Sequence, residues 1–445
     1  MLDKQAKIIG EDKVLFDHIW KTGKGFYIFV SILAALVLWG VYAYVTQYLT
    51  GLAVTGLSRQ IFWGVYITNF VFFIGISHAG TFISAVLRIL KAEWRRPIAR
   101  ASELTTVFIL MFGVGSVLID LGRPDRMLYA IRYAHFRSPL LWDVCSIATY
   151  LTVSSICLYL ALIPDIALLR DLGGKREWFY RILSLGWTGA EDQHRRLDRA
   201  INFVSILVIP VMITVHTVVS FVFAMTIQPM WHSAIFGPYF VAGAIFSGIA
   251  ALIIAMNVIR KVYHLEDYLR PIHFNYLGIL LLVMTLLWFY FTFAEYLTTF
   301  YGGEPLHMTI FWSKFTGRFA PYFWGMFLFC FVIPLPLLAM RKTRTPLGTL
   351  IASISVTLGM WLERFVIVVP TLSNPRLPNE SAFYGPTWIE WSVFAGCVSF
   401  FIVLYMIFTK FFPIVSIWEV REGREKSLAE VQQRIKTYLP GIGME

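Results

Sequence analysis

The stretch 276-YLGILLLVMTLLWFYFTF-293 carries no charged residue over its whole length. The stretch 27-YIFVSILAALVLWGVYAYV-45 has the same character. A transmembrane helix needs about 20 consecutive, mostly apolar residues to cross the hydrocarbon core of a bilayer. Both stretches reach that length, so they predict an integral membrane protein built from α-helices.

The composition of the whole chain supports this interpretation. Of its 445 residues 58% are hydrophobic and only 15% are charged, whereas soluble domains carry about 25% charged residues. The net charge of +11 does not indicate nucleic-acid binding, because membrane proteins concentrate Lys and Arg in their cytoplasmic loops. The first twenty residues carry charges throughout, so we expect no cleavable leader peptide.

Ten apolar runs predict ten transmembrane helices. They lie at about residues 25–47, 61–87, 104–121, 139–163, 200–224, 236–259, 274–297, 321–340, 347–369 and 389–412.

Basic residues alternate between the loops and so predict the orientation. The N-terminal arm has five Lys, the segment 88–100 has five basic residues and the loop 170–199 has seven. This pattern places both termini in the cytoplasm. The outer loop 122–138 is an exception to this alternation, because it is rich in arginine although it lies on the outer side. We expect it to contact either phospholipid headgroups or an acidic or cofactor-bearing partner. Its four arginines are Arg123, Arg126, Arg132 and Arg137.

An internal repeat predicts how the helices are grouped. The segments 64-GVYITNFVFFIGI-76 and 237-GPYFVAGAIFSGI-249 share the pattern G-x-Y-x6-F-x-G-I. The openings 139-PLLWD-143 and 321-PYFWG-325 share P-x-x-W, in the same order. We therefore expect two four-helix bundles, formed by helices 2–5 and 6–9, with two flanking helices. The predicted parts are an N-terminal arm (1–24), helix 1 (25–60), a first bundle (61–226), a second bundle (227–370), helix 10 (371–412) and a C-terminal tail (413–445).

Ionisable residues inside the predicted spans are functional candidates, because such groups are costly in the bilayer. The first bundle contains His78, Asp120, Asp143 and His216. Oxidation of a hydroquinone releases two protons and two electrons, and a carboxylate or imidazole beside the quinol hydroxyl can accept a proton. Structural roles are also open for each residue. Asp120 would pair with Arg123, Asp143 would be a cap or first-turn acid of its helix, and each histidine would bond to a neighbouring helix.

The second bundle contains Glu295, Glu363 and Arg364. Glu363 points about 100° away from Arg364 on an ideal helix, so we expect Glu295 to be the counter-ion of Arg364. The three residues form either a structural ion pair or a proton path.

Redox metals are not expected in this chain. Cys145, Cys157, Cys330 and Cys397 form no C-x-x-C pair, which argues against an iron–sulfur cluster. Haem b would need two histidines at one depth. Only His78 and His216 lie in spans, and counting along their helices places them at different depths.

Three motifs resemble one known family. The segments 75-GISHAG-80, 119-IDLGRPDR-126 and 139-PLLWD-143 resemble those of the polysulfide reductase membrane subunit (NrfD) family. Ten spans with long cytoplasmic ends look most like the C subunit of bacterial alternative complex III.

The resemblance implies menaquinol oxidation near the outer face of a bacterial cytoplasmic membrane, with His78, Asp120 and Asp143 as catalytic residues. Arg123 and His216 would join His78 and Asp143 in binding quinol. Electrons would pass to an iron–sulfur subunit on the outer face and then to haem c subunits. A second homologous membrane subunit would complete the complex.

Two other classes of function remain open on the sequence alone. A secondary transporter can also show ten spans and a repeat, although such proteins often have broken helices at midplane sites. A structural membrane anchor for a peripheral complex is the second class. The acids clustered at the outer edge favour quinol chemistry over both.

Overall fold

The computed structural model describes residues 12–374 and 383–426. The parts of the predicted N-terminal arm and C-terminal tail beyond these limits lie outside the described residues. The prediction of an all-α membrane protein with ten spans is confirmed, and the described residues contain no β-strand. The ten spans are α3 (Lys24–Thr50), α4 (Val65–Ile89), α5 (Arg96–Asp120), α7 (Pro139–Asp171), α9 (Glu191–Ala224), α10 (Phe236–Val262), α11 (Pro271–Gly302), α13 (Ala320–Phe327) with α14 (Pro334–Ala339), α15 (Pro346–Ser373) and α16 (Trp388–Phe411).

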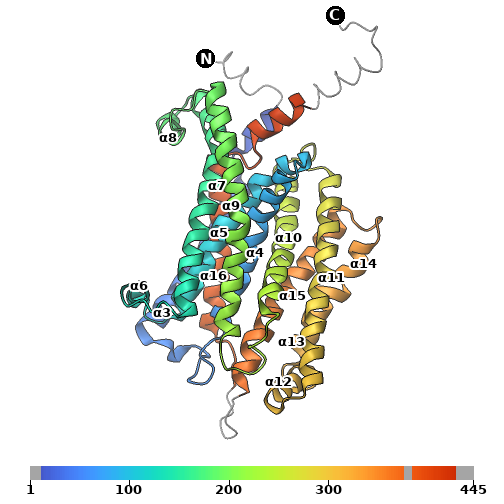
Figure 1. Cartoon of the computed structure of the whole chain (residues 1–445). Helices are drawn as coiled ribbons and strands as arrows, with labels where there is room; N and C mark the ends of the chain where they lie inside the picture. Colours follow the sequence, from blue (N-terminus) through green and yellow to red (C-terminus); the bar gives the residue numbers. More distant parts are fainter. Residues whose placement is uncertain (1–11, 375–382, 427–445) are drawn as a thin grey trace, which may run out of the picture.

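In the part of the chain that the structure describes, four short helices lie at the ends of the spans. They are α2 (Lys13–Trp20), α6 (Tyr129–Arg132), α8 (Glu177–Leu183) and α12 (Pro305–Phe315). We call the end that carries α2 and α8 the inner end and the end that carries α6 and α12 the outer end (Figure 1). The names follow the orientation predicted from the loop charges.

The spans pack as two neighbouring groups. Helix α4 contacts α5 and α9, and α7 contacts the same two helices, which closes a ring of four. In the second group α10 contacts α11 and α15, while α13 and α14 pack on α15. The two groups meet chiefly where α4 packs against α10, and α3 pairs with α16 beside them (Figure 1).

Glycines permit the closest helix contacts. A Cβ atom on Gly80 of α4 would lie only 2.1 Å from the carbonyl oxygen of Ser102 on α5. In the α3–α16 pair, a Cβ on Gly40 would lie 2.8 Å from the Cα of Gly396. Small residues at such positions let helix backbones approach in a membrane, where packing replaces the hydrophobic effect as the driving force.

The eighth span is interrupted. A π-helical segment, Leu328–Val332, separates α13 from α14. Pro334 and Pro336 follow it directly, and each lacks the backbone N–H that a continuous α-helix would use. The proline pair therefore accounts for the break.

A buried ion pair ties the chain beyond α16 to the inner end of the first group. The side chains of Arg100 on α5 and Asp165 on α7 are 1% and 0% exposed and form a salt bridge. Asp165 also accepts hydrogen bonds from the backbone N–H groups of Ile417 and Trp418, each at 3.0 Å. Removal of one member of such a pair typically costs about 3–5 kcal/mol.

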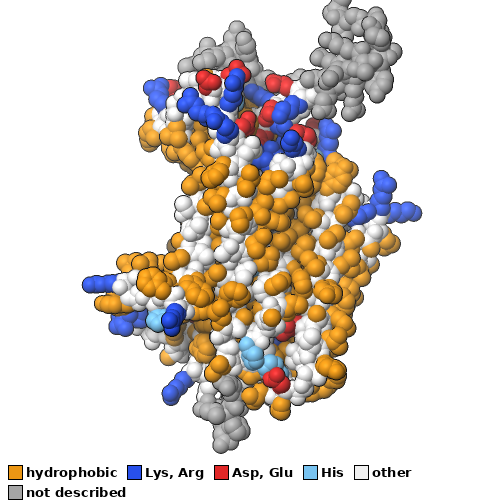
Figure 2. Space-filling model, in the orientation of Figure 1, with side chains coloured by type: hydrophobic (Ala, Val, Ile, Leu, Met, Phe, Trp, Pro, Cys, Tyr) orange, Lys and Arg blue, Asp and Glu red, His pale blue; other side chains and the backbone are white. Residues whose placement is uncertain are grey.

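The distribution of charged and hydrophobic side chains on the surface agrees with a middle section that is embedded in the bilayer. Figure 2 shows Lys and Arg side chains gathered at the inner end, above a broad hydrophobic surface. Basic side chains also project around the part of the outer end that carries α6, as the sequence of loop 122–138 predicts (Figure 2).

Candidate functional site

His78 lies in the middle of α4 and its side chain is fully buried. Its Nδ1 atom lies 2.5 Å from the carbonyl oxygen of Ile74, one turn earlier. That contact favours the tautomer in which Nδ1 carries the proton. The other ring nitrogen, Nε2, has no hydrogen-bond partner among the described residues. The imidazole ring stacks on Tyr150 of α7 at a centroid distance of 4.8 Å.

His216 of α9 lies against His78. The two ring centroids are 4.4 Å apart, with the rings edge to face. His216 is also fully buried, and neither of its ring nitrogens has a hydrogen-bond partner among the described residues. A buried polar atom without a partner costs about 1–3 kcal/mol, so these nitrogens are available to a ligand or to an exchanging proton.

The prediction that the two histidines lie at different depths is wrong. His78 lies thirteen residues after the start of α4, about 20 Å along the axis, and His216 lies eight residues before the end of α9, about 12 Å. Side chains on a helix tilt toward its N-terminus. The two helices run in opposite directions, so His78 tilts outward and His216 inward, and the tilts bring the rings together.

Arg364 continues this cluster into the second group of helices. Its guanidinium lies 4.9 Å above the ring of Phe240 on α10, and its charge acts on His216. Gly243 of α10 makes room for it, because a Cβ there would lie 2.7 Å from Nη2 of Arg364. The two groups of helices thus share one buried polar cluster, formed by Tyr150, His78, His216, Arg364 and Glu363, which we call the central cluster.

The counter-ion of Arg364 is not the one that the sequence predicts. Nη1 of Arg364 lies 3.0 Å from Oε2 of Glu363, and both side chains are 1% exposed. Glu295, the expected partner, accepts a hydrogen bond of 2.6 Å from Ser233 instead. The prediction failed because both side chains are long and can bend toward each other, although their Cβ atoms diverge.

Polar side chains extend from Glu363 toward the outer end. Trp288 of α11 donates its indole N–H to Glu363 at 3.2 Å. Tyr239 of α10 lies beside Glu363 and accepts a hydrogen bond of 3.3 Å from the hydroxyl of Thr292. Thr292 lies one turn before Glu295 on α11.

Glu295 faces a buried lysine that sequence reasoning missed. Lys314 of α12 is 3% exposed, and its ammonium lies 5.7 Å from the ring centroid of Tyr296. Burial lowers the pKa of Lys314 to about 8, while the nearby charge of Glu295 acts in the opposite direction. An ammonium with such a pKa exchanges its proton more readily than an exposed lysine does.

Asp120 ends α5 near the outer end, and its Oδ1 atom is buried without a partner among the described residues. The alternative in which Asp120 pairs with Arg123 is wrong, because Arg123 pairs with Asp125 at 3.1 Å. Asp120 lies instead within electrostatic reach of Glu390 on α16 and of Tyr66 on α4. It therefore faces the side of the first group that carries α16.

Asp143 lies in α7, beyond the helix's first turn, which contains no acid. The alternative in which Asp143 is a cap or a first-turn acid of its helix is therefore wrong. The side chain is 8% exposed, and its Oδ1 has no partner in the described chain. Asp143 precedes Tyr150 by seven residues, about 10 Å along the axis. Among the described residues, no hydrogen bond, ion pair or ring contact joins His78, Asp120 and Asp143 to one another.

The four arginines of the outer loop are all exposed. Large apolar side chains of the same loop are exposed beside them, including Leu128, Tyr133 and Phe136 at 66%, 69% and 81%. The loop thus presents a mixed basic and aromatic surface next to the outer ends of α5 and α7.

Other buried charged residues escaped the sequence analysis. Glu390 is 0% exposed, and its carboxylate is the acceptor for the hydroxyl of Tyr384. Glu103 of α5 accepts a hydrogen bond from Ser84 at 2.8 Å, and its Oε2 has no partner among the described residues. Arg100 and Glu103 were missed because the predicted third span began after them, and Asp165 was missed because the predicted fourth span ended before it. The basic segment 88–100, assigned wholly to a loop, in fact contains the first turns of α5.

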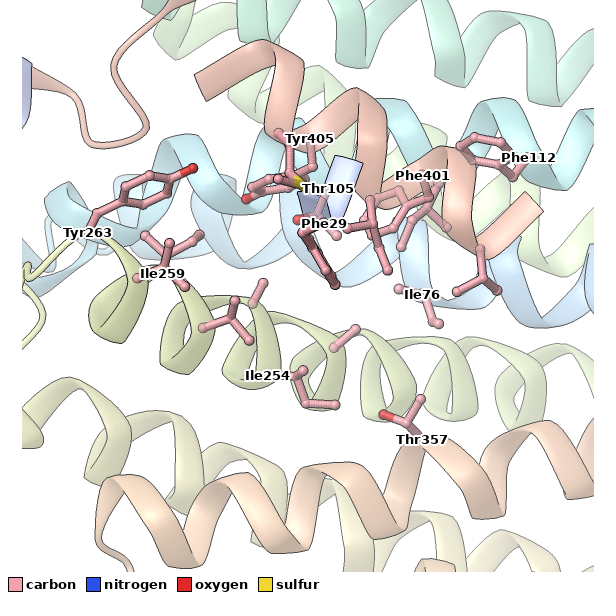
Figure 3. Close-up of a pocket in the computed structure, with 18 of the residues that line it drawn as sticks. Phe29, Ile76, Thr105, Phe112, Ile254, Ile259, Tyr263, Thr357, Phe401 and Tyr405 are labelled. Atoms are coloured by element: carbon pink, nitrogen blue, oxygen red, sulfur yellow. The ribbon is translucent and has the colours of Figure 1, made fainter. Parts of the chain in front are cut away.

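The large cavity of the molecule lies elsewhere. It has a volume of about 1400 Å³ and runs between α10 and α16, with α4 and α5 behind it. Figure 3 shows Ile254 and Ile259 of α10 on one side and Phe401 and Tyr405 of α16 on the other. None of the predicted site residues lines it.

No group of three or more His, Cys, Asp or Glu side chains could hold a metal ion within the part of the chain that the structure describes. The predicted site residues divide into four places, of which the exposed arginines of the outer loop are one. His78 and His216 join Arg364 and Glu363 in the central cluster. Asp120 and Asp143 lie apart near the outer end, and Glu295 lies in the outer part of the second group.

Comparison with known proteins agrees with this architecture. Residues 53–374 match the model of the family described as polysulphide reductase, NrfD. The C subunit of the selenate reductase of Mesobacillus selenatarsenatis is 24% identical over 91% of this chain and 98% of its own length. The Hdr-like menaquinol oxidoreductase integral membrane subunit of Archaeoglobus fulgidus is 22% identical over 90% of this chain and 96% of its own.

A third relative is the menaquinone reductase integral membrane subunit of Nitratidesulfovibrio vulgaris, which is 22% identical over 84% of this chain and 88% of its own length. The family match covers most of the chain and both groups of helices. This multi-pass integral membrane protein therefore belongs to the NrfD polysulphide reductase family.

Proposed function

We propose that this chain is the quinol-binding membrane subunit of a respiratory or photosynthetic electron-transfer complex. Its substrate would be menaquinol, since two relatives are named for menaquinol or menaquinone. The observation that carries the proposal is the His78–His216 pair, whose buried and unbonded nitrogens can exchange protons. Intramembrane ionisable groups of this kind mark functional sites.

The proposed reaction removes two electrons and two protons from the quinol, which leaves the quinone. Nε2 of His78 has a free lone pair in the favoured tautomer, so it can accept a proton from a quinol hydroxyl. Asp143 and Asp120 accept protons nearer the outer end, and His216 and Arg123 help to bind the quinol. Because the acids lie about 10 Å or more from the histidines, we propose that they receive protons in sequence rather than at one contact.

The electrons pass to a partner, since we propose that this chain holds no haem or iron–sulfur cluster. The exposed loop with Arg123, Arg126, Arg132 and Arg137 is the proposed docking surface for an iron–sulfur subunit on the outer face. Haem c subunits and a second homologous membrane subunit would complete a complex similar to alternative complex III, with this chain as its C subunit. The complex would lie in a bacterial cytoplasmic membrane, with both termini of the chain in the cytoplasm.

The central cluster supports a further proposal of proton translocation. From His216 the path would run through Arg364 and Glu363, and then by Tyr239 and Thr292 to Glu295. The contact of Glu363 with Arg364, the position of Tyr239 beside Glu363 and the hydrogen bond from Thr292 to Tyr239 support a polar route across α15, α10 and α11.

The test begins with purification of the complex in mild detergent and a list of its subunits, together with an absorption spectrum. Quinol-to-acceptor turnover is then measured for His78→Ala and Asp143→Asn, with the exposed His194→Ala as the matched control. Loss of a general base is expected to lower turnover about 10²- to 10⁴-fold, while the subunit list stays unchanged. Unchanged turnover in both variants, with the complex intact, would leave the protein as a structural anchor.

Two further measurements address solute transport and proton translocation. Solute flux through vesicles that hold the chain alone would favour a secondary transporter. The proton-to-electron ratio is measured in vesicles that hold the complex. A ratio equal to the one that quinol oxidation alone gives would contradict the translocation proposal. If the measured ratio is higher, Glu295→Gln is expected to lower it to the value of quinol chemistry alone while electron transfer continues.

A further inference from the structure

The cavity between α10 and α16 is an open groove in the surface that faces the bilayer. Its lining is almost wholly apolar. Several lining side chains are half exposed or more, such as Val258 at 53%, Val262 at 60% and Leu358 at 52%, so the groove opens sideways as well. A surface depression of this size in a membrane protein holds either lipid or another apolar partner.

The groove has one charged end, at the inner surface. There it is lined by Asp17, His18, Lys21, His264 and Lys410. Lys21 pairs with Asp17 at 2.7 Å. Burial and the charge of Lys410 lower the pKa of His18 to about 4, so this imidazole is neutral at pH 7. Exposed Lys261 lies beside the mouth, three residues before His264.

Lys410 supplies an uncompensated positive charge at this mouth. Its ammonium donates to the backbone carbonyl oxygens of His18 at 2.7 Å and Lys21 at 2.9 Å. An ammonium has three donors, so one remains for a ligand beside the ring of Phe26, whose centroid lies 4.7 Å from the ammonium. No carboxylate lies within 4.0 Å of Lys410 among the residues that the structure describes. The two carbonyl contacts fix the charge in position without neutralising it.

The inner half of the groove has the length of one lipid leaflet. From Lys410 to Phe401 on α16 is nine residues, or about 13 Å, and half of the hydrocarbon core is roughly 15 Å. In this half Ile259 and Ile254 of α10 face Tyr405 and Phe401 of α16, with Thr105 of α5 behind them (Figure 3). Ala251 and Ala255 on α10 widen the groove. Acyl chains that enter from the mouth therefore meet apolar side chains over their full length.

We propose that this groove binds an anionic diacyl phospholipid, with its phosphate at Lys410 and Lys21 and its acyl chains between α10 and α16. Basic pockets between transmembrane helices on the cytoplasmic side recognise anionic headgroups in this way. The bound lipid joins α2, α10 and α16, which share few direct contacts at this place. It occupies a different site from the quinol, because none of the quinol-site residues lines the groove.

The test reconstitutes the full chain, in its purified complex, into nanodiscs of equal parts phosphatidylglycerol and phosphatidylcholine. Native mass spectrometry after detergent extraction counts the retained lipids of each class. We expect one retained phosphatidylglycerol, favoured about tenfold over phosphatidylcholine. Lys410→Gln and Lys21→Gln are expected to bring the preference close to one. Lys342→Gln, an exposed inner-end lysine outside the groove, is the matched control and should leave it unchanged.

A second pair of variants covers the case in which loss of Lys410 disturbs folding. Asp17→Asn removes the one acid among the described residues at the mouth and should raise the anionic preference. Ala255→Trp fills the inner groove and should abolish retention of both lipids. Retention without a headgroup preference, retention of a quinone instead of a phospholipid, or no retained lipid in the assembled complex would each overturn the proposal. Quinol turnover measured in parallel tests the quinol site independently.

Discussion

Glu363→Gln is expected to destabilise the protein strongly, because it removes the counter-ion of a buried arginine. The charges of Glu363 and Arg364 lie 3.0 Å apart, and both side chains are 1% exposed. Coulomb's law with an effective dielectric constant of about 20 gives an attraction of about 5.5 kcal/mol at this distance. The glutamine variant loses that attraction but keeps the burial cost of the guanidinium. The ring of Phe240 still stabilises the cation by about 1–2 kcal/mol. We therefore expect a loss of about 3–5 kcal/mol in the free energy of unfolding.

The assay is reversible unfolding in mixed micelles, applied to a double-mutant cycle. Arg364→Met alone leaves the Glu363 carboxylate buried without its counter-ion, with only the neutral side chains of Trp288 and Tyr239 described beside it, so it should cost a similar amount. Replacing both residues removes both charges, and the double variant should lose about 3 kcal/mol less than the sum of the single losses. If each single variant loses less than about 1 kcal/mol of unfolding free energy and the two losses simply add, the two charges do not depend on each other, and the reasoning is refuted.

Three further predictions test the packing and the inner end. Gly80→Ala is expected to cost about 1–3 kcal/mol or more of unfolding free energy, because its Cβ would lie 2.1 Å from the Ser102 carbonyl oxygen; an unchanged midpoint in the same unfolding assay would contradict the close contact. Tyr384→Phe removes the hydroxyl that accepts from the backbone N–H of Val65 at 2.7 Å and donates to Glu390, so thermal denaturation should show a loss of about 1–3 kcal/mol. Burial and Lys410 lower the pKa of His18 from 6.5 to about 4, so the folded state binds fewer protons than the unfolded state between these values. Stability from this group is complete above pH 6.5 and falls by about 3 kcal/mol as the pH drops to 4; the protection factors of the α2 amides, corrected for the pH dependence of intrinsic hydrogen exchange, should fall over that range in the wild type and not in His18→Phe.

The sequence was sufficient for the spans, because their length and apolar character are properties of consecutive residues. The stretch around Leu281 and Trp288 is one example, and it forms the middle of α11. The boundaries were less accurate where charged residues continue a helix into the bilayer edge. Arg100 and Asp165 lie in α5 and α7, yet each fell outside the predicted spans, because the sequence does not show that the two charges neutralise each other.

The candidate site was predicted only in part. His78 and His216 were singled out correctly as residues inside spans, but their contact depends on opposite side-chain tilts and on the stagger of two helices. The Arg364–Glu363 pair depends on how two flexible side chains bend. The angle of about 100° between neighbouring residues on an ideal helix does not describe that bending. Glu390 and Lys314 were missed because both lie close to predicted loops, where charged residues are ordinary. Their burial follows from contacts with residues far away in the sequence, such as the bond between Glu390 and the backbone N–H of Gly56 at 2.8 Å.

The position of the bound quinol is the central claim, and photolabelling measures it directly. The purified complex is irradiated with a photoreactive menaquinone analogue, and the labelled peptides are identified by mass spectrometry. We expect labels on α4, α7 and α9 near His78, Asp143 and His216. Excess menaquinone should suppress these labels, and His78→Ala should reduce them. Labels confined to the groove between α10 and α16, or labels on α4 that His78→Ala leaves unchanged, would contradict it.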